Sequence, residues 1–231
     1  MLLNEKILLV ISPHPDDEIL GCGGLIAKIK ALGGKVFVIM FAVGNAKQIG
    51  GESSTAMRTK EVKEVMAYMN VDGYEIIYMD DNIHLKLDMI PRRDLIDLIE
   101  SKSTYSINNI DPDIIAIPSL ACQNQDHEAV FQAAFTACRP RVKKGLRNAM
   151  TVLAYEQVDN LWTSRIFKPT FYVDISDYLD NKITALALYA TQMREEPNLR
   201  SIENVKRLSQ LRGSEICVKA AEAFECCRFI C

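Results

Sequence analysis

No stretch of this sequence is apolar enough, over a sufficient length, to cross a membrane as a helix. The first apolar run, residues 7–11, is far shorter than the ~20 residues that a spanning helix needs, and no small-residue cleavage site follows it. We therefore expect no membrane span and a cytoplasmic location.

The chain also lacks an excess of basic residues. The chain has 27 Lys and Arg residues against 30 Asp and Glu residues, which gives a formal net charge of −3. No run of Lys and Arg is long enough to suggest a polybasic membrane patch. We therefore expect neither nucleic acid nor a lipid surface as a partner.

Cys-x-x-Cys pairs are absent, although the chain contains seven cysteines. An odd number of cysteines, in a chain with no predicted secretory leader, favours free thiols over a disulfide framework. Cys226, Cys227 and Cys231 could together bind a soft metal, but their spacing matches no standard zinc site. Free thiols are the expectation for this cluster as well.

Repeats, low-complexity segments and convincing linkers are also missing. A length of 231 residues fits one sizeable domain, so residues 1–231 are expected to form a single domain. Contents of 48% hydrophobic and 25% charged residues are those of an ordinary globular protein.

What the chain does have is an alternation of strand-like and helix-like segments. Strands are predicted at 6–11, 36–43, 74–79, 114–117, 151–155, 171–173 and 224–230, and helices at 19–32, 53–69, 91–100, 126–138, 175–193 and 201–212. Residues 44–51 are predicted to form a polar loop. This alternation predicts an α/β fold, with a Rossmann-like, mostly parallel sheet and helices on both faces.

Acidic residues crowd around a histidine directly after the first predicted strand, in Ser12-Pro13-His14-Pro15-Asp16-Asp17-Glu18. Three adjacent carboxylates repel one another, and a bound cation relieves that repulsion. A second polar segment, Gln123-Asn124-Gln125-Asp126-His127-Glu128, follows the predicted strand at 114–117. Ligands of such sheets bind beyond the carboxyl ends of the strands, so both segments can meet there.

Histidine is scarce, and its distribution favours a metal site. Two of the three histidines, His14 and His127, lie in these acid-rich segments. With Asp17 they form a usual catalytic zinc set, which leaves a position open for water. His84 has no second partner of the metal-binding kind nearby in the sequence and is predicted to be a loop residue.

The segment Pro13-His14-Pro15-Asp16-Asp17-Glu18 resembles the PHPDDE signature of the PIG-L/LmbE-like zinc-dependent de-N-acetylases. Asn124-Gln125-Asp126-His127 resembles the second metal motif of that family, and Arg58-Thr59-Lys60-Glu61 and Met79-Asp80-Asp81-Asn82 resemble two further landmarks. The resemblance implies one zinc ion per chain and removal of the acetyl group from an N-acetylglucosamine-type sugar or sugar conjugate. Homo-oligomerisation stays open.

Carried over residue by residue, the resemblance assigns zinc to His14, Asp17 and His127. It makes Asp16 the general base that takes a proton from metal-bound water as the water attacks the amide carbonyl. Asp126 would orient a neighbouring group.

Two further positions match substrate-binding residues of the family. Arg58 would grip a phosphate or a sugar hydroxyl, although an exposed helix arginine paired with Glu61 or a neighbouring acid fits the sequence equally well. Asp81 would accept hydrogen bonds from sugar hydroxyls, and a turn carboxylate is its alternative.

The sequence departs from the family pattern at Asn124, where many members have histidine, and at Cys122, where they have an acid. Asn124 can donate a neutral hydrogen bond but cannot become a cation. We expect this change to affect the rate and the choice of substrate more than zinc binding, and Asn124 to take part in catalysis.

Three other functions remain in view. Dinucleotide binding is disfavoured because Gly21, Gly23 and Gly24 do not form G-x-G-x-x-G and because acidic residues precede them. An inactive sugar-binding subunit would explain Asn124 and Cys122, but not a retained base. A metal-dependent amidase acting on a non-sugar acyl amide would need the same site, and another divalent metal could replace zinc.

Overall fold

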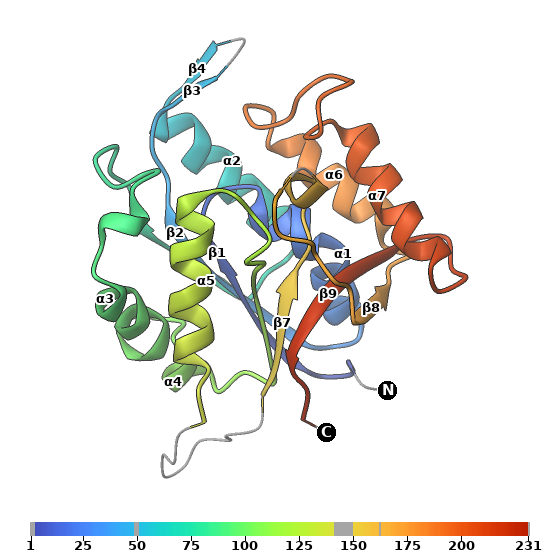
Figure 1. Cartoon of the computed structure of the whole chain (residues 1–231), viewed down its shortest axis with the longest axis horizontal. Coiled ribbons are helices and arrows are strands. Elements are labelled where there is room, and N and C mark those ends of the chain that lie inside the picture. Colours follow the sequence, from blue (N-terminus) through green and yellow to red (C-terminus); the bar gives the residue numbers. More distant parts are fainter. Residues whose placement is uncertain (1–2, 49–50, 141–149, 162, 231) are drawn as a thin grey trace.

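A seven-stranded sheet forms the centre of the computed structural model, which describes residues 3–48, 51–140, 150–161 and 163–230 (Figure 1). In sheet order the strands are β5 (Gly73–Tyr78), β2 (Lys35–Ala42), β1 (Ile7–Ser12), β6 (Ile114–Pro118), β7 (Thr151–Tyr155), β9 (Ala221–Arg228) and β8 (Phe171–Asp174). The first five run parallel, while β9 is antiparallel to β7 and β8. The predicted fold class is therefore confirmed.

Helices cover both faces of this sheet (Figure 1). The described helices are α1 (Asp17–Ala31), α2 (Thr55–Tyr68), α3 (Arg92–Asp97), α4 (Ile107–Ile110), α5 (Gln125–Ala137), α6 (Leu179–Leu188) and α7 (Ile202–Ser214), with short η1 (Leu87–Met89), η2 (Leu98–Lys102) and η3 (Val158–Leu161). None of them, within the described part of the chain, is both long and apolar enough to span a membrane.

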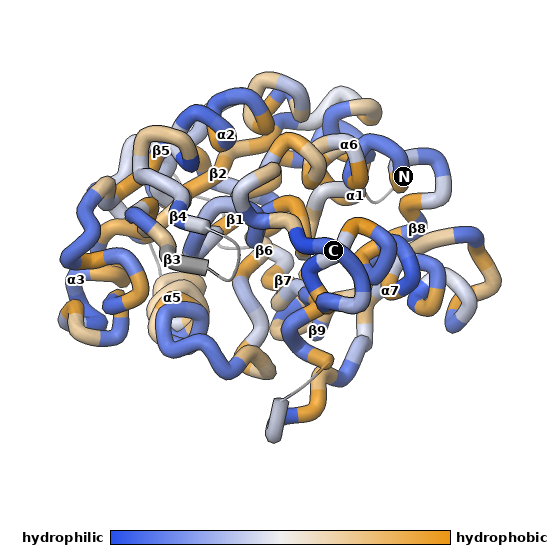
Figure 2. The backbone as a smooth tube through the Cα atoms, turned by 90° about the horizontal axis from the view of Figure 1, so that it is seen from above, coloured by the Kyte–Doolittle hydropathy of each residue, from blue (hydrophilic) through white to orange (hydrophobic). Residues whose placement is uncertain are grey.

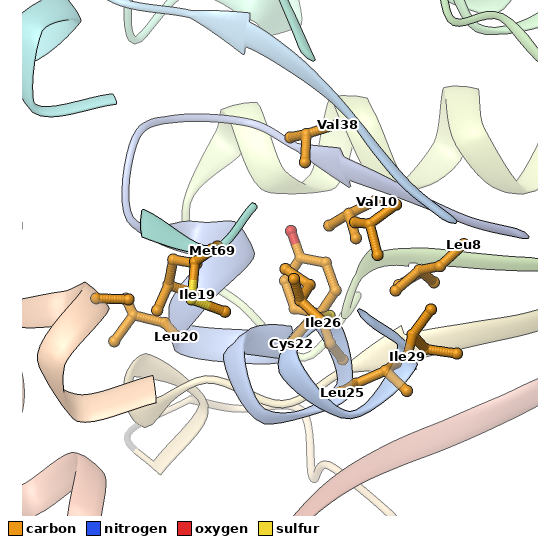
Figure 3. Packing of buried hydrophobic residues seen from close by; sticks show 14 of the residues in the cluster. Leu8, Val10, Ile19, Leu20, Cys22, Leu25, Ile26, Ile29, Val38 and Met69 are labelled. Atoms are coloured by element: carbon orange, nitrogen blue, oxygen red, sulfur yellow. The ribbon is translucent and has the colours of Figure 1, made fainter. Parts of the chain in front are cut away.

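The central strands are apolar throughout because each of their faces packs against helices. In β1, Leu8 and Val10 belong to the core beneath α1, whereas Leu9 and Ile11 belong to the core beneath α3 and α5. Successive side chains of a strand point to opposite faces, so a strand buried on both faces has no polar alternation. Figure 2 shows these strands as apolar segments inside the molecule, and Figure 3 shows Leu8, Val10 and Val38 against α1.

The larger differences from the sequence prediction lie in four segments. Residues 44–51 contain part of a hairpin, β3 (Ala46–Gln48) with β4 (Gly51–Ser53), whose strands are too short to produce a periodic pattern. The helix predicted at 175–193 begins only at Leu179 and ends at Leu188. Asp174 Oδ1 accepts hydrogen bonds from Ser176 N and Oγ, which turn the chain before the helix starts. The helix predicted at 91–100 becomes π-helical after α3, and β9 begins three residues before the predicted strand.

Close contact between α1 and β7 depends on a glycine. A Cβ atom at Gly21 would lie 2.2 Å from Cδ2 of Tyr155, a fully buried ring whose hydroxyl donates to Ile11 O. We expect Gly21→Ala to lower the free energy of unfolding by about 1–3 kcal/mol, since overpacking outweighs the better helix propensity of alanine. Urea denaturation measures this. Lys63→Ala, on the exposed face of α2, is the control, and an unchanged stability of Gly21→Ala would contradict the packing argument.

Candidate metal and catalytic site

The candidate site lies at the carboxyl ends of the central strands, where the sequence predicted it. The segment after β1 carries His14, Asp16 and Asp17, and the segment after β6 carries Asn124 and His127. Because β1 and β6 are neighbouring parallel strands, their following segments meet at one edge of the sheet.

His14, Asp17 and His127 form a buried cluster whose possible ligand atoms all lie within 4.8 Å of one another. Oδ2 of Asp17 lies 3.5 Å from His14 Nδ1 and 3.1 Å from His127 Nε2. The same oxygen accepts a hydrogen bond of 2.9 Å from the backbone N–H of His14, which fixes the carboxylate beside both rings. The structure thus brings together the three predicted ligands.

The donor atoms of this cluster fit a metal ion. Both ring nitrogens of His127 are buried without a hydrogen-bond partner among the described residues, although Nε2 faces Asp17. Burial would lower the pKa of His127, but the Asp17 carboxylate outweighs it and raises that pKa well above its usual value. Burial would likewise raise the pKa of Asp17, and the two histidines hold it well below its usual range. The site therefore attracts positive charge, which a divalent cation would supply after displacing the proton of His127.

Neighbouring groups hold two of the three ligands in place. Nε2 of His14 lies 2.8 Å from Oδ2 of Asp126, and Oδ1 of Asp126 accepts from Leu87 N, so Asp126 orients the His14 ring. A carboxylate in this position also fixes which ring nitrogen of a histidine faces a metal. Oδ1 of Asp17 accepts a hydrogen bond of 2.8 Å from Gln157 Nε2. Nδ1 of His14 and Oδ2 of Asp17 are left to face His127.

Asp16 lies beside this cluster in a strained backbone conformation. Its φ of 93° is one that residues other than glycine rarely adopt, although it occupies the N-cap of α1. The side chain does not cap the helix. Oδ2 instead accepts a hydrogen bond of 2.8 Å from Arg200 Nη1, and Oδ1 is buried with no partner among the described residues.

Burial raises the pKa of Asp16 to about 7, with Arg200 opposing the rise and Asp17 adding to it. Strain at one residue together with an unpartnered carboxylate oxygen is typical of a functional group that the surrounding structure holds in place.

Arg58 is not the exposed arginine that the sequence left open. It is 3% exposed, and Nη1 donates to Gly44 O and to His84 Nε2 at 2.8 and 2.9 Å. Among the described residues no ion pair joins Arg58 to Glu61, whose carboxylate accepts hydrogen bonds from Thr191. Arg58 lines the site, and no carboxylate of the described residues is hydrogen bonded to its guanidinium.

His84 lies in the loop between β5 and η1, as the sequence predicted, but it is buried and packs against the site. His84 is 6% exposed, and its ring lies 5.2 Å from the His14 ring in an edge-to-face arrangement. Arginine only donates hydrogen bonds, so Nε2 of His84 accepts from Arg58 and the ring is neutral, with its proton on Nδ1. Being one of only three histidines was the sequence signal that could have indicated this position.

Asp81 lies outside the cavity of the site. Its carboxylate accepts hydrogen bonds from the N–H and Nδ2 of Asn45, at 2.7 and 2.5 Å, and from the hydroxyl of Thr55 at 3.0 Å. These bonds connect the loop after β5 to the start of α2, in agreement with a turn carboxylate. A substrate-binding role for Asp81 stays a prediction.

A cavity of about 340 Å³ opens beside the cluster. Most of its lining residues have polar side chains, and the lining consists of His14, Pro15, Asp16, Asp17, Asn45, Ala46, Arg58, His84, Leu85, Asn124, Gln192 and Arg200. Gln192 and Arg200 come from the connection between α6 and α7, which sequence reasoning did not connect with the site. Neither residue belongs to a recognisable sequence motif, and the two lie near residues 14–17 only in the folded chain.

The family model described as "PIG-L: GlcNAc-PI de-N-acetylase" matches residues 9–138, which is more than half of the chain. The chain belongs to this family. The resemblance inferred from the sequence motifs is confirmed, and the matched span includes His14, Asp16, Asp17 and His127.

Two curated relatives of this PIG-L protein are deacetylases by name. The uncharacterized deacetylase YaiS of Escherichia coli K12 is 27% identical over 186 residues, which are 79% of this chain and 89% of YaiS. The diacetylchitobiose deacetylase of Thermococcus kodakarensis is 25% identical over 211 residues, 85% of this chain and 76% of that protein. The predicted enzyme class, a deacetylase, agrees with both.

Solved structures confirm the fold of this PIG-L protein over nearly its whole length. The conserved protein TT1542 from Thermus thermophilus matches with a TM-score of 0.75 and 24% identity, covering 97% of this chain and 96% of that one. The 4-carboxy-2-hydroxymuconate hydratase GalB from Pseudomonas putida KT2440 matches with a TM-score of 0.70 and 19% identity, covering 98% of both chains. Since this fold also carries a hydratase, function must be argued from the site.

Asn124, the departure from the family pattern, caps α5 in this PIG-L protein. Its Oδ1 accepts a hydrogen bond of 2.9 Å from Asp126 N, and the residue also lines the cavity. We expect Asn124→His to change kcat, to keep the metal, and to lower the melting temperature by about 2–4 °C, because losing a cap costs about 1 kcal/mol.

Thermal unfolding and metal analysis of purified Asn124→His test this expectation. Asn124→Asp, which keeps an oxygen acceptor for Asp126 N, is the control and should melt close to the unsubstituted chain. Loss of metal from the histidine variant would mean that position 124 contacts the ion directly.

Proposed function

We propose that the chain is a zinc-dependent hydrolase that removes the N-acetyl group from an N-acetylglucosamine-type sugar or sugar conjugate. The observation that supports this most strongly is the strained, buried Asp16 beside the His14–Asp17–His127 cluster, with one carboxylate oxygen that has no hydrogen-bond partner in the described part of the chain. Family membership and the deacetylase names of the relatives point the same way.

In this proposal His14, Asp17 and His127 hold the metal, and Asp16 acts as general base. Zinc, when bound, would polarise the amide carbonyl and acidify water. Asp16 accepts a proton from the water that attacks the carbonyl carbon, and it then delivers that proton to the departing nitrogen. The C–N bond breaks, and acetate and a free amine are released.

Asn124 and Arg58 would act on the substrate. Oδ1 of Asn124 is engaged with Asp126 N, which leaves the Nδ2 amide as a donor for a substrate oxygen. Arg58 is held by Gly44 and His84 through Nη1 and lines the cavity, where its positive charge would attract hydroxyl or anionic groups of the substrate. A volume of about 340 Å³ is at the small end of ligand pockets, which span roughly 300–1,000 Å³, and so suits one sugar ring better than a long chain.

An inactive sugar-binding subunit would have no use for the geometry of Asp16. Binding alone requires neither a carboxylate oxygen left without a partner nor a backbone held at a φ of 93°. A non-sugar acyl amide remains the alternative substrate, because only the acetamide itself meets the metal and the base. A cytoplasmic location and a homo-oligomeric state stay predictions.

The first experiment is metal analysis of the purified chain, combined with acetate release before and after chelation. The substrates are N-acetylglucosamine, diacetylchitobiose, a nucleotide-linked N-acetylglucosamine and an N-acetyl amino acid. About one zinc per chain with chelator-sensitive acetate release from a sugar is the expected result. Acetate release only from the amino acid would favour the amidase. Bound metal without any acetate release, or no metal after loading, would contradict the proposal.

A further inference from the structure

Arg200 connects the candidate base to a second carboxylate. Its Nη1 donates to Oδ2 of Asp16 at 2.8 Å, while Nε and Nη2 donate to Oδ2 of Asp159 at 3.0 and 2.5 Å. The Arg200 side chain is 28% exposed and lines the cavity, whereas the Asp16 side chain is 1% exposed. A planar guanidinium bonded at both ends can scarcely rotate, so it holds the bond to Asp16 in one direction.

The connection between α6 and α7 is built to place Arg200 there. Its backbone N–H donates to Asn198 Oδ1 at 2.9 Å, and its carbonyl accepts from Arg194 N at 3.1 Å. The next residue, Ser201, caps α7 by accepting from Asn204 N. These three hydrogen bonds fix the backbone around Arg200, so the fold determines where its side chain lies.

The two oxygens of Asp16 are therefore not equivalent. Oδ2 is engaged with Arg200, and Oδ1 has no partner among the described residues. Because the Asp16 side chain does not cap α1, its hydrogen bond from Arg200 is the one that fixes the carboxylate plane among the described residues.

We propose that Arg200, held by Asp159, is a positioning residue that fixes the Asp16 carboxylate through Oδ2 and so directs Oδ1 to the attacking water. The O–H bond of the water breaks as its oxygen bonds the carbonyl carbon, and the proton passes to Oδ1. It then passes to the nitrogen as the C–N bond breaks. This role rests on the proposed deacetylase function and adds to it a residue outside the matched family span.

The test compares Arg200→Ala, Arg200→Lys and Asp159→Asn with the unsubstituted chain. We expect Arg200→Ala to lower kcat by about 10- to 100-fold, part of the roughly 10²–10⁴-fold that a positioned base contributes, with KM within about threefold. Arg200→Lys and Asp159→Asn should lose less. Metal content should stay at the level of the unsubstituted chain in all three. The matched control is Arg207→Ala, an exposed arginine of α7 that is paired with Glu196 and lies outside the cavity lining.

Two further readouts separate positioning from a structural role. Added guanidinium ion should restore part of the kcat of Arg200→Ala, since it can occupy the vacated place between the two aspartates. In the double variant Asp16→Asn/Arg200→Ala, removal of the arginine should cost little beyond the loss from Asp16→Asn alone, because a positioning group has no effect without the group it positions.

Each contrary outcome has its own meaning. If the unsubstituted chain releases no acetate from any substrate, the proposed function fails, and the role of Arg200 fails with it. If that chain is active and Arg200→Ala keeps its kcat, only the positioning role is overturned. A raised KM with unchanged kcat would make Arg200 a substrate-binding group, and loss of metal would make it a structural support of the cluster. Either result would also overturn the proposal.

Discussion

Asp16→Ala is expected to keep its metal and to lose most of its activity, with kcat lower by about 10²–10⁴-fold. Asp16 contributes no atom to the His14–Asp17–His127 cluster, so its removal leaves the ligands intact. Its Oδ1 is the carboxylate oxygen beside the cluster that has no partner among the described residues. The measurement is metal content per chain together with kcat for acetate release.

Asp16→Asn is the companion variant, because it keeps the shape of the side chain and an oxygen for the Arg200 hydrogen bond. It should fold as well as the unsubstituted chain and be as inactive as Asp16→Ala. Activity retained in both variants would disprove the base assignment. Loss of metal in both would instead place Asp16 among the ligands.

Much of the fold could be predicted because its central strands are buried on both faces. Residues 6–11 and 36–43 are almost wholly apolar, and segments with helical periodicity follow them. Short apolar runs between helical segments are typical of parallel strands that are buried on both faces. The hairpin β3–β4 escaped prediction because a three-residue strand has no period to detect. The late start of α6 escaped prediction because a local turn, in which Ser176 N and Oγ both donate to Asp174 Oδ1, precedes the helix.

The metal cluster could be predicted because its members lie in two short, unusual segments. Three adjacent carboxylates repel one another unless a cation is bound, so this cluster beside a histidine indicates a metal site from the sequence alone. The two segments lie close together because they follow β1 and β6, neighbouring parallel strands whose carboxyl ends meet at one edge of the sheet.

Arg200 and Asp159 could not be predicted in this way, because they lie in segments without a motif. The scarcity of histidine was a signal for His84, but its contacts with Arg58 and His14 could not be predicted from it. All three residues reach the site through contacts between residues far apart in the chain. Arg200 and Asp16 are separated by 184 positions, and Arg58 and His84 by 26. A side chain that supports a site from a distant loop leaves no periodicity or spacing in the sequence, and the folded structure is needed to reveal it.

His127→Ala is expected to abolish stable metal binding. The variant removes one of three ligands and leaves His14 and Asp17, which cannot complete a tetrahedral site without a further protein donor. Replacing a residue that merely supports a ligand already weakens metal binding by roughly 10- to 100-fold, so loss of a ligand itself should exceed about 100-fold. Metal titration of the apoprotein measures the affinity, and the loss of activity should follow the loss of metal.

His84→Ala is the matched control, since it removes a buried histidine whose ring lies 5.2 Å from His14 without belonging to the cluster. That variant should keep its metal, although it frees Arg58 Nη1 from one of its two acceptors. The ion stabilises only the folded chain, so excess zinc should raise the melting temperature of His84→Ala and leave that of His127→Ala unchanged. Equal responses of the two variants to zinc would show that burial of an imidazole, rather than coordination by His127, is what this part of the site requires.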